Sequence, residues 1–289
     1  MNDLTAMNWS EGESAALDEI ENFLPEQPSE GVVLQATGIS VAFGGVQALQ
    51  EVTISVPARS FVGLIGPNGS GKTTLFNVMN GFTTPDSGRL EAFGVDITKK
   101  DPWDRAKLGI SRTFQANHIS PDLTVRDNIL TGAFLHIPGG VVTSVLRLPK
   151  VRKGVAQAAR MTTATARLLG LEPYLDVRAG SLPFGAQRRT EIARCLVSGP
   201  RLLLLDEPSA GMDATEAQQL IALVKHLHNS LGLTVCLVEH FIRMVFENCD
   251  LIHVLSRGEL LVSGTGEEVA ANSMVQQAYL GTAAGGTDA

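Results

Sequence analysis

Eight consecutive residues, Gly66 to Thr73, have the types and spacing of a phosphate-binding loop. They read Gly-Pro-Asn-Gly-Ser-Gly-Lys-Thr and match the pattern G-x-x-x-x-G-K-[ST]. Glycines let successive backbone N–H groups converge on phosphate oxygens, and a helix that starts at the end of the loop adds its positive dipole. Lys72 is expected to reach the β- and γ-phosphates, and the Thr73 hydroxyl to bind Mg²⁺. The alternative, a glycine-rich surface turn, is disfavoured by the strand-like run before the loop and the helix-like run after it.

A second candidate for chemistry is a pair of acids that closes an apolar run. Arg201 to Leu205 reads as a buried strand, and Asp206 and Glu207 follow it directly. Such a strand places both carboxylates at the edge of a sheet, where Asp206 is expected to bind Mg²⁺ through water and Glu207 to polarise the nucleophilic water. Two acids after a strand are often only a solvated loop. A phosphate loop in the same chain favours nucleotide hydrolysis instead.

The elements that must position these residues alternate between strands and helices. A strand is predicted over Phe61–Ile65 and a helix over Lys72–Asn80. Strands are also predicted over Arg201–Leu205 and Thr234–Val238, on either side of a helix over Asp213–Ser230. Apolar strands without charges indicate parallel pairing with both faces covered. The predicted fold class is therefore α/β, with a mostly parallel core sheet.

Two flanking regions differ from this core. Alternating or β-branched runs over Val32–Phe43 and Val52–Val56 predict an antiparallel β region on the N-terminal side. The stretch of about 101–196 reads as helices and loops and is expected to form a helical subdomain.

The helix after Asp213 has Glu216 three residues later, which is the spacing of a capping box.

The composition excludes several classes of protein. The chain has 289 residues, of which 44% are hydrophobic and 18% charged, so it is neither a disordered chain, a coiled coil nor a disulfide-stapled mini-protein. No apolar run approaches the roughly 18–20 residues that span a bilayer. The start of the sequence lacks a basic segment followed by an apolar stretch, so export is not expected. Three cysteines without ligand-like spacing suit a reducing compartment.

The net charge of -7 comes from one end of the chain. Residues 1–30 contain eight acids and no Lys or Arg, and the remainder is close to neutral. The chain therefore has no general basic field that would recruit nucleic acid. Residues 1–30 are expected to be a disordered acidic extension, with one short helix over Ser14–Leu24 as the alternative. Residues 31–281 form the expected domain, and residues 282–289 a flexible tail.

With these motifs, residues 31–281 resemble the ATP-binding subunits of ABC transporters. Arg112-Thr113-Phe114-Gln115 is similar to the Q-loop of that family, Ser209 to Asp213 to the D-loop, and Val238-Glu239-His240 to the switch loop. The resemblance implies that Gln115 senses Mg²⁺ and the attacking water and that His240 touches the γ-phosphate. It also implies that Phe43 stacks on adenine. As a lone residue after a strand, His240 would read as a structural histidine, but its position 34 residues after Asp206, at the end of the next strand, favours the functional reading. Without the resemblance, Phe43 reads as a strand core residue.

The resemblance also implies ATP and Mg²⁺ as cofactors, bound in a P-loop NTPase fold of the ABC cassette type. Expected catalytic residues are Glu207, His240 and Gln115, and expected Mg²⁺ ligands are Thr73, Gln115 and Asp206. The expected nucleotide-binding residues are Phe43, Gly66, Pro67, Asn68, Gly69, Ser70, Gly71, Lys72, Thr73 and Thr74.

A further segment aligns with the family signature, usually Leu-Ser-Gly-Gly-Gln-Gln, but departs from it. Here the signature residues are Leu182, Pro183, Phe184, Gly185, Ala186 and Gln187. Pro183 removes a hydroxyl and a backbone donor, Phe184 replaces the first glycine, and Ala186 removes an amide. A helix over Arg189–Leu196 is expected to keep a dipole aimed at an anion. In this family the signature of one subunit closes over the ATP of the other, which implies an asymmetric pair whose weaker site is the partner's.

Within the family, the chain looks most like the ATPases of branched-chain amino acid importers. The segments that carry this likeness are 65–69, 74–77, 114–115, 185–194, 238–240 and 278–281, while Phe241 stands where that group usually has Asp. The implied function is ATP hydrolysis that powers uptake of branched-chain amino acids or similar amino acid and amide solutes. Alternatives are the ATPase of a urea or amide importer, a nucleotide-responsive ABC scaffold with weak hydrolysis, and a soluble ABC protein of repair or translation.

The resemblance further implies partners at a membrane. These are a second ABC ATPase, expected to make a heterodimer, two transmembrane permease subunits and, indirectly, a solute-binding protein, with this chain on the cytoplasmic face and no nucleic acid partner. Residues 128–171 contain six bases and no acid. This segment is either a solvated helix pair or a peripheral contact with anionic headgroups, which attract Lys and Arg by about 1 kcal/mol each.

Overall fold

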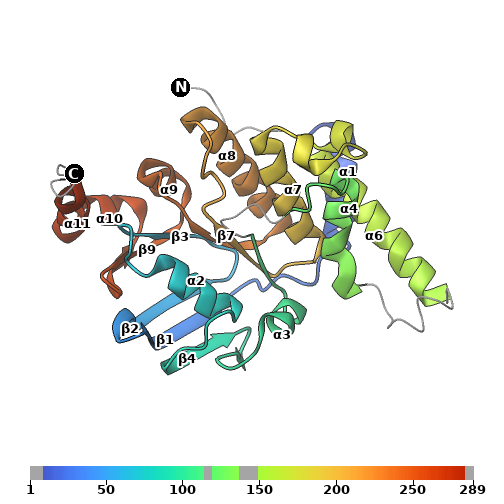
Figure 1. The fold of residues 1–289 in the computed structure, drawn as a ribbon. Coiled ribbons are helices and arrows are strands. Elements are labelled where there is room, and N and C mark those ends of the chain that lie inside the picture. Colours follow the sequence, from blue (N-terminus) through green and yellow to red (C-terminus); the bar gives the residue numbers. More distant parts are fainter. Residues whose placement is uncertain (1–8, 114–118, 137–148, 284–289) are drawn as a thin grey trace. The chain divides into compact units, whose positions relative to one another are not determined.

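The computed structural model describes residues 9–113, 119–136 and 149–283 (Figure 1). The chain divides into two compact units, which are described separately. We call the first the sheet unit; it consists of Gln27–Arg112, Leu202–Pro208 and Leu233–Ala289. The second, the helical unit, consists of Met1–Glu26, Thr113–Arg201 and Ser209–Gly232.

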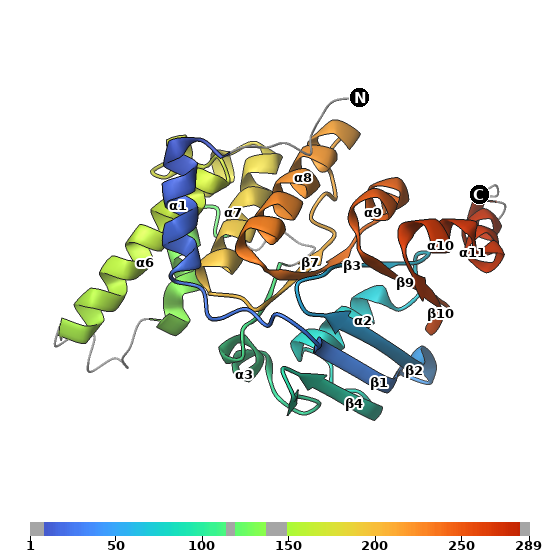
Figure 2. The ribbon, with the colours of Figure 1, turned by 180° about the vertical axis from the view of Figure 1, so that it is seen from behind.

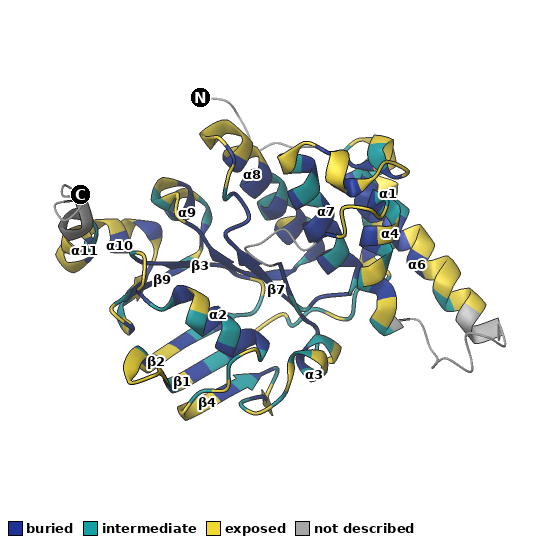
Figure 3. Ribbon diagram, viewed as in Figure 1, coloured by how far each residue is buried: buried dark blue, intermediate teal, exposed yellow. Residues whose placement is uncertain are grey.

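The sheet unit is built on a central sheet that, among the described residues, has six strands in the order β10-β9-β3-β8-β7-β6. Their bounds are β3 Phe61–Ile65, β6 Ile110–Arg112, β7 Leu202–Asp206, β8 Thr234–Val238, β9 Leu251–Ser256 and β10 Glu259–Gly264. Neighbouring strands are parallel except in the antiparallel hairpin of β9 and β10. Every residue of β3, β7 and β8 is buried (Figure 3), which explains their uninterrupted apolar sequences. The predicted mostly parallel core sheet is confirmed.

A second, antiparallel sheet of the same unit has the order β2-β1-β4-β5 within the described residues. Its strands are β1 Val32–Phe43, β2 Val46–Pro57, β4 Ser87–Ala92 and β5 Val95–Asp96. The predicted antiparallel region is therefore confirmed. The second strand is longer than the expected Val52–Val56, because the Gly44-Gly45 turn pairs Phe43 directly with Val46.

Helices of the sheet unit are α2 Lys72–Asn80, α3 Pro102–Lys107, α9 Ile242–Asn248, α10 Gly266–Ala271 and α11 Ser273–Ala283. The apolar side of α2, with Leu75, Phe76 and Met79, packs into the core that both sheets share. Helix α3 and strand β6 lie in this unit rather than in the helical one, so the expected helical subdomain of about 101–196 starts too early. Residue 101 caps α3, and the helical unit resumes at Thr113.

The helical unit contains α1 Glu11–Glu21, α4 Val125–Leu130, α6 Pro149–Leu168, α7 Phe184–Val197 and α8 Ala214–Leu231, with short 3₁₀ turns at η1 Thr131–His136, η2 Glu172–Tyr174 and η3 Ala179–Ser181. The predicted capping box of α8 is confirmed, because the Asp213 side chain accepts from Glu216 N and the Glu216 side chain accepts from Asp213 N. None of the described helices is both long and apolar enough to cross a membrane.

Helix α1 corrects one expectation about the acidic extension. Instead of being disordered, residues 11–21 form a helix that starts with a capping box at Ser10 and lies against α6 (Figure 2). The short-helix alternative is closer, although the helix begins three residues before the expected Ser14. The physical reason is an apolar stripe in an acidic sequence: Ala16 and Ile20 are buried, while Glu19 pairs with Arg160 at 3.3 Å. At the other end of the chain, α11 continues to Ala283, and most of the expected tail lies outside the described residues.

Candidate active site

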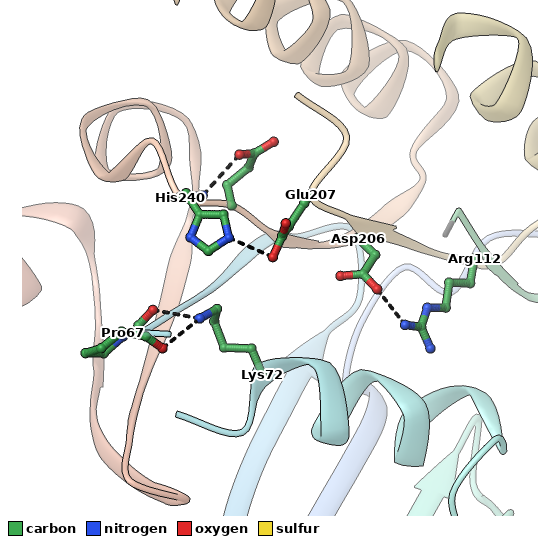
Figure 4. A network of polar contacts seen from close by, with 8 residues as sticks. Pro67, Lys72, Arg112, Asp206, Glu207 and His240 are labelled. Carbon is green, nitrogen blue, oxygen red and sulfur yellow. Dashed lines mark hydrogen bonds and ion pairs between the residues drawn. The ribbon is translucent and has the colours of Figure 1, made fainter. Parts of the chain in front are cut away.

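The loop after β3 holds Lys72 against its own backbone (Figure 4). The Lys72 Nζ donates to the carbonyl oxygens of Gly66 at 2.7 Å and Pro67 at 3.0 Å. Burial lowers the pKa of Lys72, and the negative charges of Glu207 and Asp206 oppose that shift. The Lys72 ammonium is therefore only partly solvated. It is held at the loop within electrostatic range of two carboxylates.

Glycines are required at both ends of this loop by close backbone approach. A Cβ on Gly66 would lie 2.2 Å from the carbonyl oxygen of Leu255, and one on Gly71 would lie 2.6 Å from that of Ala48. Gly71 also has φ +101°, a conformation that side chains disfavour. Nothing lies within 4 Å of the Cβ position of Gly69, so the middle of the loop is open.

The donors around this open loop fit a phosphate group with a bound cation. Helix α2 starts without a side-chain cap, so its first N–H groups are available to an anion. The Ser70 hydroxyl oxygen is buried without a hydrogen-bond partner. Buried polar groups are normally hydrogen-bonded, so this hydroxyl is suited to bond to a ligand in the loop. Thr73, on the first turn, is exposed, and its hydroxyl suits a hard cation such as Mg²⁺.

The two acids lie at the end of β7 as the sequence predicted, and they point to different partners. Asp206 Oδ2 pairs with Arg112 Nη2 at 2.5 Å, and both side chains are almost fully buried. Glu207 leaves the strand in the left-handed region, at φ +47°, and its N–H donates to the Val238 carbonyl. Such a conformation is costly for a residue with a side chain and is typical of functional positions.

Glu207 and His240 contact each other at the carboxyl edge of the central sheet (Figure 4). His240 Nε2 lies 2.7 Å from Glu207 Oε1. The Glu207 side chain is 8% exposed and that of His240 46% exposed, so the carboxylate is sheltered while the imidazole faces solvent. The pairing puts an acceptor for a water proton and a second titratable group side by side, near the Lys72 loop.

The structure describes all but one of the remaining predicted residues of the nucleotide site. Phe43 ends β1 and is 55% exposed, which favours the stacking role over the strand core reading. Asn68 and Gly69 are exposed, and Pro67 and Thr74 are partly exposed. Gln115, predicted both as a catalytic residue and as an Mg²⁺ ligand, lies outside the described residues, as does Phe114.

The signature segment starts its helix earlier than expected. Helix α7 begins at Phe184 rather than Arg189, with Pro183 as its N-cap, so Phe184 to Gln187 form its first turn. The reason is backbone geometry: Pro183 has a φ compatible with helix entry, and its carbonyl accepts from the N–H groups of Ala186 and Gln187. Phe184 is 40% exposed, and no side chain caps this helix. The first-turn N–H groups remain, although the serine hydroxyl of the family pattern does not.

Two contacts of the site were not predicted. Arg112 bridges Asp206 and Asn77, the latter at 2.7 Å; the sequence pointed to Arg112 only as part of the Q-loop motif. Tyr279 on α11 hydrogen-bonds to the backbone of Gly66, and burial raises the pKa of Tyr279 to about 12. An aromatic residue near the C-terminus, in a segment that resembled the family, was the available signal for it.

Comparisons with known proteins agree with this geometry. Residues 49–210 match the family model described as ABC transporter. The high-affinity branched-chain amino acid transport ATP-binding proteins LivG of Salmonella typhimurium and BraF of Pseudomonas aeruginosa are each 35% identical over 251 residues, which are 87% of this chain and 98% of each relative.

Solved structures give the same result. A nucleotide-free ATP-binding cassette from an ABC transporter superposes with a TM-score of 0.75 at 30% identity, over 86% of this chain and 99% of that one. An ATP-binding cassette in its ADP conformation gives a TM-score of 0.75 at 32% identity, over 87% and 99%. A phosphate loop, two acids at the end of one strand and a histidine just beyond the end of the next thus occur in a chain that belongs to the ABC transporter family.

Proposed function

We propose that this chain is the ATP-hydrolysing subunit of an ABC importer for branched-chain amino acids or chemically similar amino acid and amide solutes. The contact of Glu207 with His240 beside the Lys72 loop carries the hydrolytic part of the proposal. The names of the relatives LivG and BraF support the choice of cargo class. Because Glu207 and His240 can support hydrolysis, they favour an ATP-hydrolysing subunit over a nucleotide-responsive scaffold with weak hydrolysis.

The loop residues hold the nucleotide. The N–H groups of the loop and of the first turn of α2 bind phosphate oxygens, Lys72 exchanges its two carbonyl partners for the β- and γ-phosphates, and Ser70 supplies a hydroxyl. Phe43 stacks on the adenine. Thr73, Asp206 and Gln115 would hold Mg²⁺, since hydroxyl, carboxylate and amide oxygens are ligands that suit a hard cation.

Glu207 activates the water. Its carboxylate accepts the proton of the attacking water, while His240 keeps the carboxylate oriented and reaches the γ-phosphate from its exposed side. Mg²⁺ held by Thr73, Asp206 and Gln115 would neutralise charge that develops on the phosphate oxygens. The sheltered position of Glu207 strengthens these interactions because little solvent screens them.

Closure with a second cassette completes the site and transmits force. The signature of each subunit covers the ATP of the other. Closure and separation of the two cassettes on the cytoplasmic face of a membrane move two transmembrane permease subunits, which receive solute from a solute-binding protein. Since Pro183 and Ala186 weaken this chain's signature, the partner is a different cassette and the pair is asymmetric. No nucleic acid takes part.

Fewer bases of segment 128–171 are available for a membrane contact than its composition suggests. Arg160 and Arg167 pair with Glu19 and Glu172, whereas Arg152 and Lys153 are exposed on α6. Arg147 lies outside the described residues. We expect replacement of Arg152 and Lys153 by Gln to weaken binding to anionic vesicles at low salt, and unchanged binding would exclude the contact.

One experiment tests the main proposal. The chain is co-purified with its permease subunits, reconstituted into proteoliposomes and supplied with ATP and labelled leucine. We expect ATP-dependent uptake that Lys72→Ala abolishes. Uptake of urea or an amide instead of leucine would identify the alternative importer, and Mg·ATP binding without turnover would identify a scaffold.

The asymmetry has its own test. Mixed complexes that carry Glu207→Gln in this chain, or the equivalent change in the partner, are compared in single-turnover ATPase assays. A larger loss from the change in this chain is expected, and equal losses would contradict an asymmetric pair.

A further inference from the structure

Arg112 is buried beside the acid that the proposed function assigns to Mg²⁺. The side chains of Arg112 and Asp206 are 4% and 1% exposed, and they form an ion pair of 2.5 Å. A second guanidinium nitrogen, Nη1, donates to Asn77 Oδ1 at 2.7 Å, and the guanidinium lies 5.6 Å from the ring centre of Phe76. Three elements, β6, β7 and α2, thus contribute to one buried polar cluster.

The ion pair involves only one oxygen of the Asp206 carboxylate. Oδ2 points to Arg112, and in Figure 4 the other carboxylate oxygen points away from Arg112, toward the side on which Lys72 and His240 lie. A guanidinium has a planar set of donors that fixes the plane of a carboxylate, which a single ammonium does not do. The direction of the second oxygen therefore depends on where Arg112 sits.

Arg112 itself has a fixed position. It is the last residue of β6, whose backbone pairs in parallel with β7 so that Arg112 faces Leu204, two residues before Asp206. The Asn77 amide holds the guanidinium from the α2 side. Because Asn77 follows the phosphate-binding turn on the same helix, the cluster links Asp206 to the element that carries Lys72 and Thr73.

We propose that Arg112 is a positioning residue that presents the second oxygen of Asp206 to nucleotide-bound Mg²⁺. This inference rests on the proposed function, because it takes Asp206 as the metal-binding acid. In this role Arg112 acts through the carboxylate of Asp206, with which it pairs. It also compensates the buried charge of Asp206 when no cation is bound.

The prediction concerns the Mg²⁺ requirement and not only activity. Partners that orient a metal ligand typically contribute ten- to a hundredfold to metal affinity. For Arg112→Met in the full-length chain, the Mg²⁺ concentration that half-maximally promotes binding of a fluorescent ATP analogue should rise about tenfold or more. Binding of the analogue in EDTA should stay within about twofold of the wild type, because the loop and helix start are untouched.

A matched control separates this effect from the loss of a buried arginine. Arg105 is also buried in the sheet unit, but its guanidinium donates to the carbonyl oxygens of Val78, Lys100 and Thr98. Arg105→Met should lower the thermal unfolding midpoint while it leaves the Mg²⁺ requirement within about twofold. Arg112→Lys keeps the charge but not the planar donors, so it should raise the Mg²⁺ requirement by an intermediate factor.

The outcomes are distinguishable even if Arg112→Met folds poorly. In that case the Mg²⁺ requirement is measured on Arg112→Lys. Arg112→Met combined with Asp206→Asn should recover stability, because no unpaired charge remains buried. If nucleotide binding by the wild type depends on Mg²⁺ but Arg112→Met or Arg112→Lys leaves the Mg²⁺ requirement unchanged, this inference is wrong. The proposed function is not affected by that result. A wild-type chain that binds no Mg·ATP overturns the proposed function and the inference with it.

Discussion

Glu207 Oε1 lies 2.7 Å from His240 Nε2, although the two residues are 33 positions apart in the chain. The contact exists because β7 and β8 are neighbouring parallel strands, with Asp206 opposite Val238. Each strand ends at the same edge, and the residues just beyond that edge meet. The left-handed backbone of Glu207 turns its side chain out of the strand direction at this point.

Replacing Glu207 by Gln should separate hydrolysis from binding. The amide keeps the shape of the side chain and a hydrogen bond to His240, but it accepts a proton from water poorly, so the turnover rate should fall about 10²- to 10⁴-fold. Binding of Mg·ATP should stay within about threefold. Steady-state ATPase and equilibrium binding assays of the assembled complex measure both quantities.

A matched variant for Glu207→Gln is Glu259→Gln, which removes an exposed carboxylate from β10 of the same unit. It should leave the rate unchanged. A Glu207→Gln complex that hydrolyses ATP within about twofold of the wild type would remove Glu207 from the reaction.

Two glycines of the phosphate loop should respond differently to alanine. Gly66→Ala places a Cβ 2.2 Å from a backbone oxygen, so it should cost about 3 kcal/mol of the free energy of unfolding and abolish nucleotide binding. Gly69→Ala meets no neighbour, and its positive φ should cost only about 1 kcal/mol. Urea denaturation and nucleotide binding of both variants test this. Equal costs would contradict the view that close packing requires Gly66.

The core elements were predictable because their signals are local. Phe61–Ile65 and Thr234–Val238 are short apolar runs that end at turns, and helix Lys72–Asn80 lies between two glycines with positive φ. The structure has these three elements at the predicted bounds. The placement of the candidate catalytic residues at strand ends followed from the topology of a parallel sheet.

Other features depend on residues that are distant in sequence. The pairing of Arg112 with Asp206 joins positions 94 apart, and no spacing rule connects them. Helix α1 was predicted only as the alternative to disorder and with later bounds, because eight acids in residues 1–30 hide an apolar stripe that needs α6 as its partner. The early start of α7 follows from Pro183 acting as the N-cap, which the family pattern did not indicate.

Phe184 should be energetically coupled to Gly211 of the D-loop segment. A Cβ on Gly211, which has φ +85°, would lie 3.3 Å from the nearest Phe184 ring atom, and the Arg188 guanidinium lies 5.1 Å from the centre of the same ring. Gly211→Ala should therefore destabilise the chain, and less so when Phe184 has already been replaced by alanine. A double-mutant cycle by chemical denaturation should give a coupling of about 0.5–3 kcal/mol.

Gly185→Ala is the control for that cycle. Its Cβ would meet Met212 at 4.0 Å, an ordinary contact, so its effect should be the same in the wild-type background and in the Phe184→Ala background. A Phe184–Gly211 coupling of zero would show that the ring does not join the signature turn to the D-loop segment.

The buried His253 should make stability depend on pH. Its Nδ1 lies 2.7 Å from Ser263 Oγ and its Nε2 lies 2.8 Å from the Ser55 carbonyl oxygen, so the neutral ring is held between β10 and β2. Burial lowers the pKa of His253 below its usual 6.5, and the Ser55 carbonyl opposes this only in part. The unfolded chain therefore binds a proton at a higher pH than the folded chain does. Stability from this residue is complete above about pH 6.5 and is lost as pH falls below that value, by up to about 1.4 kcal/mol per pH unit.

His253→Gln isolates this contribution, because its amide can still donate to the Ser55 carbonyl but does not titrate. The free energy of unfolding is measured by urea denaturation at pH 7.5 and pH 5.5 for both chains. Other titrating groups affect the two chains alike, so the wild type should lose about 1 kcal/mol more than the variant over this range. Equal losses would mean that His253 accepts a proton in the folded chain as readily as in the unfolded one, against its burial and its two fixed hydrogen-bond partners.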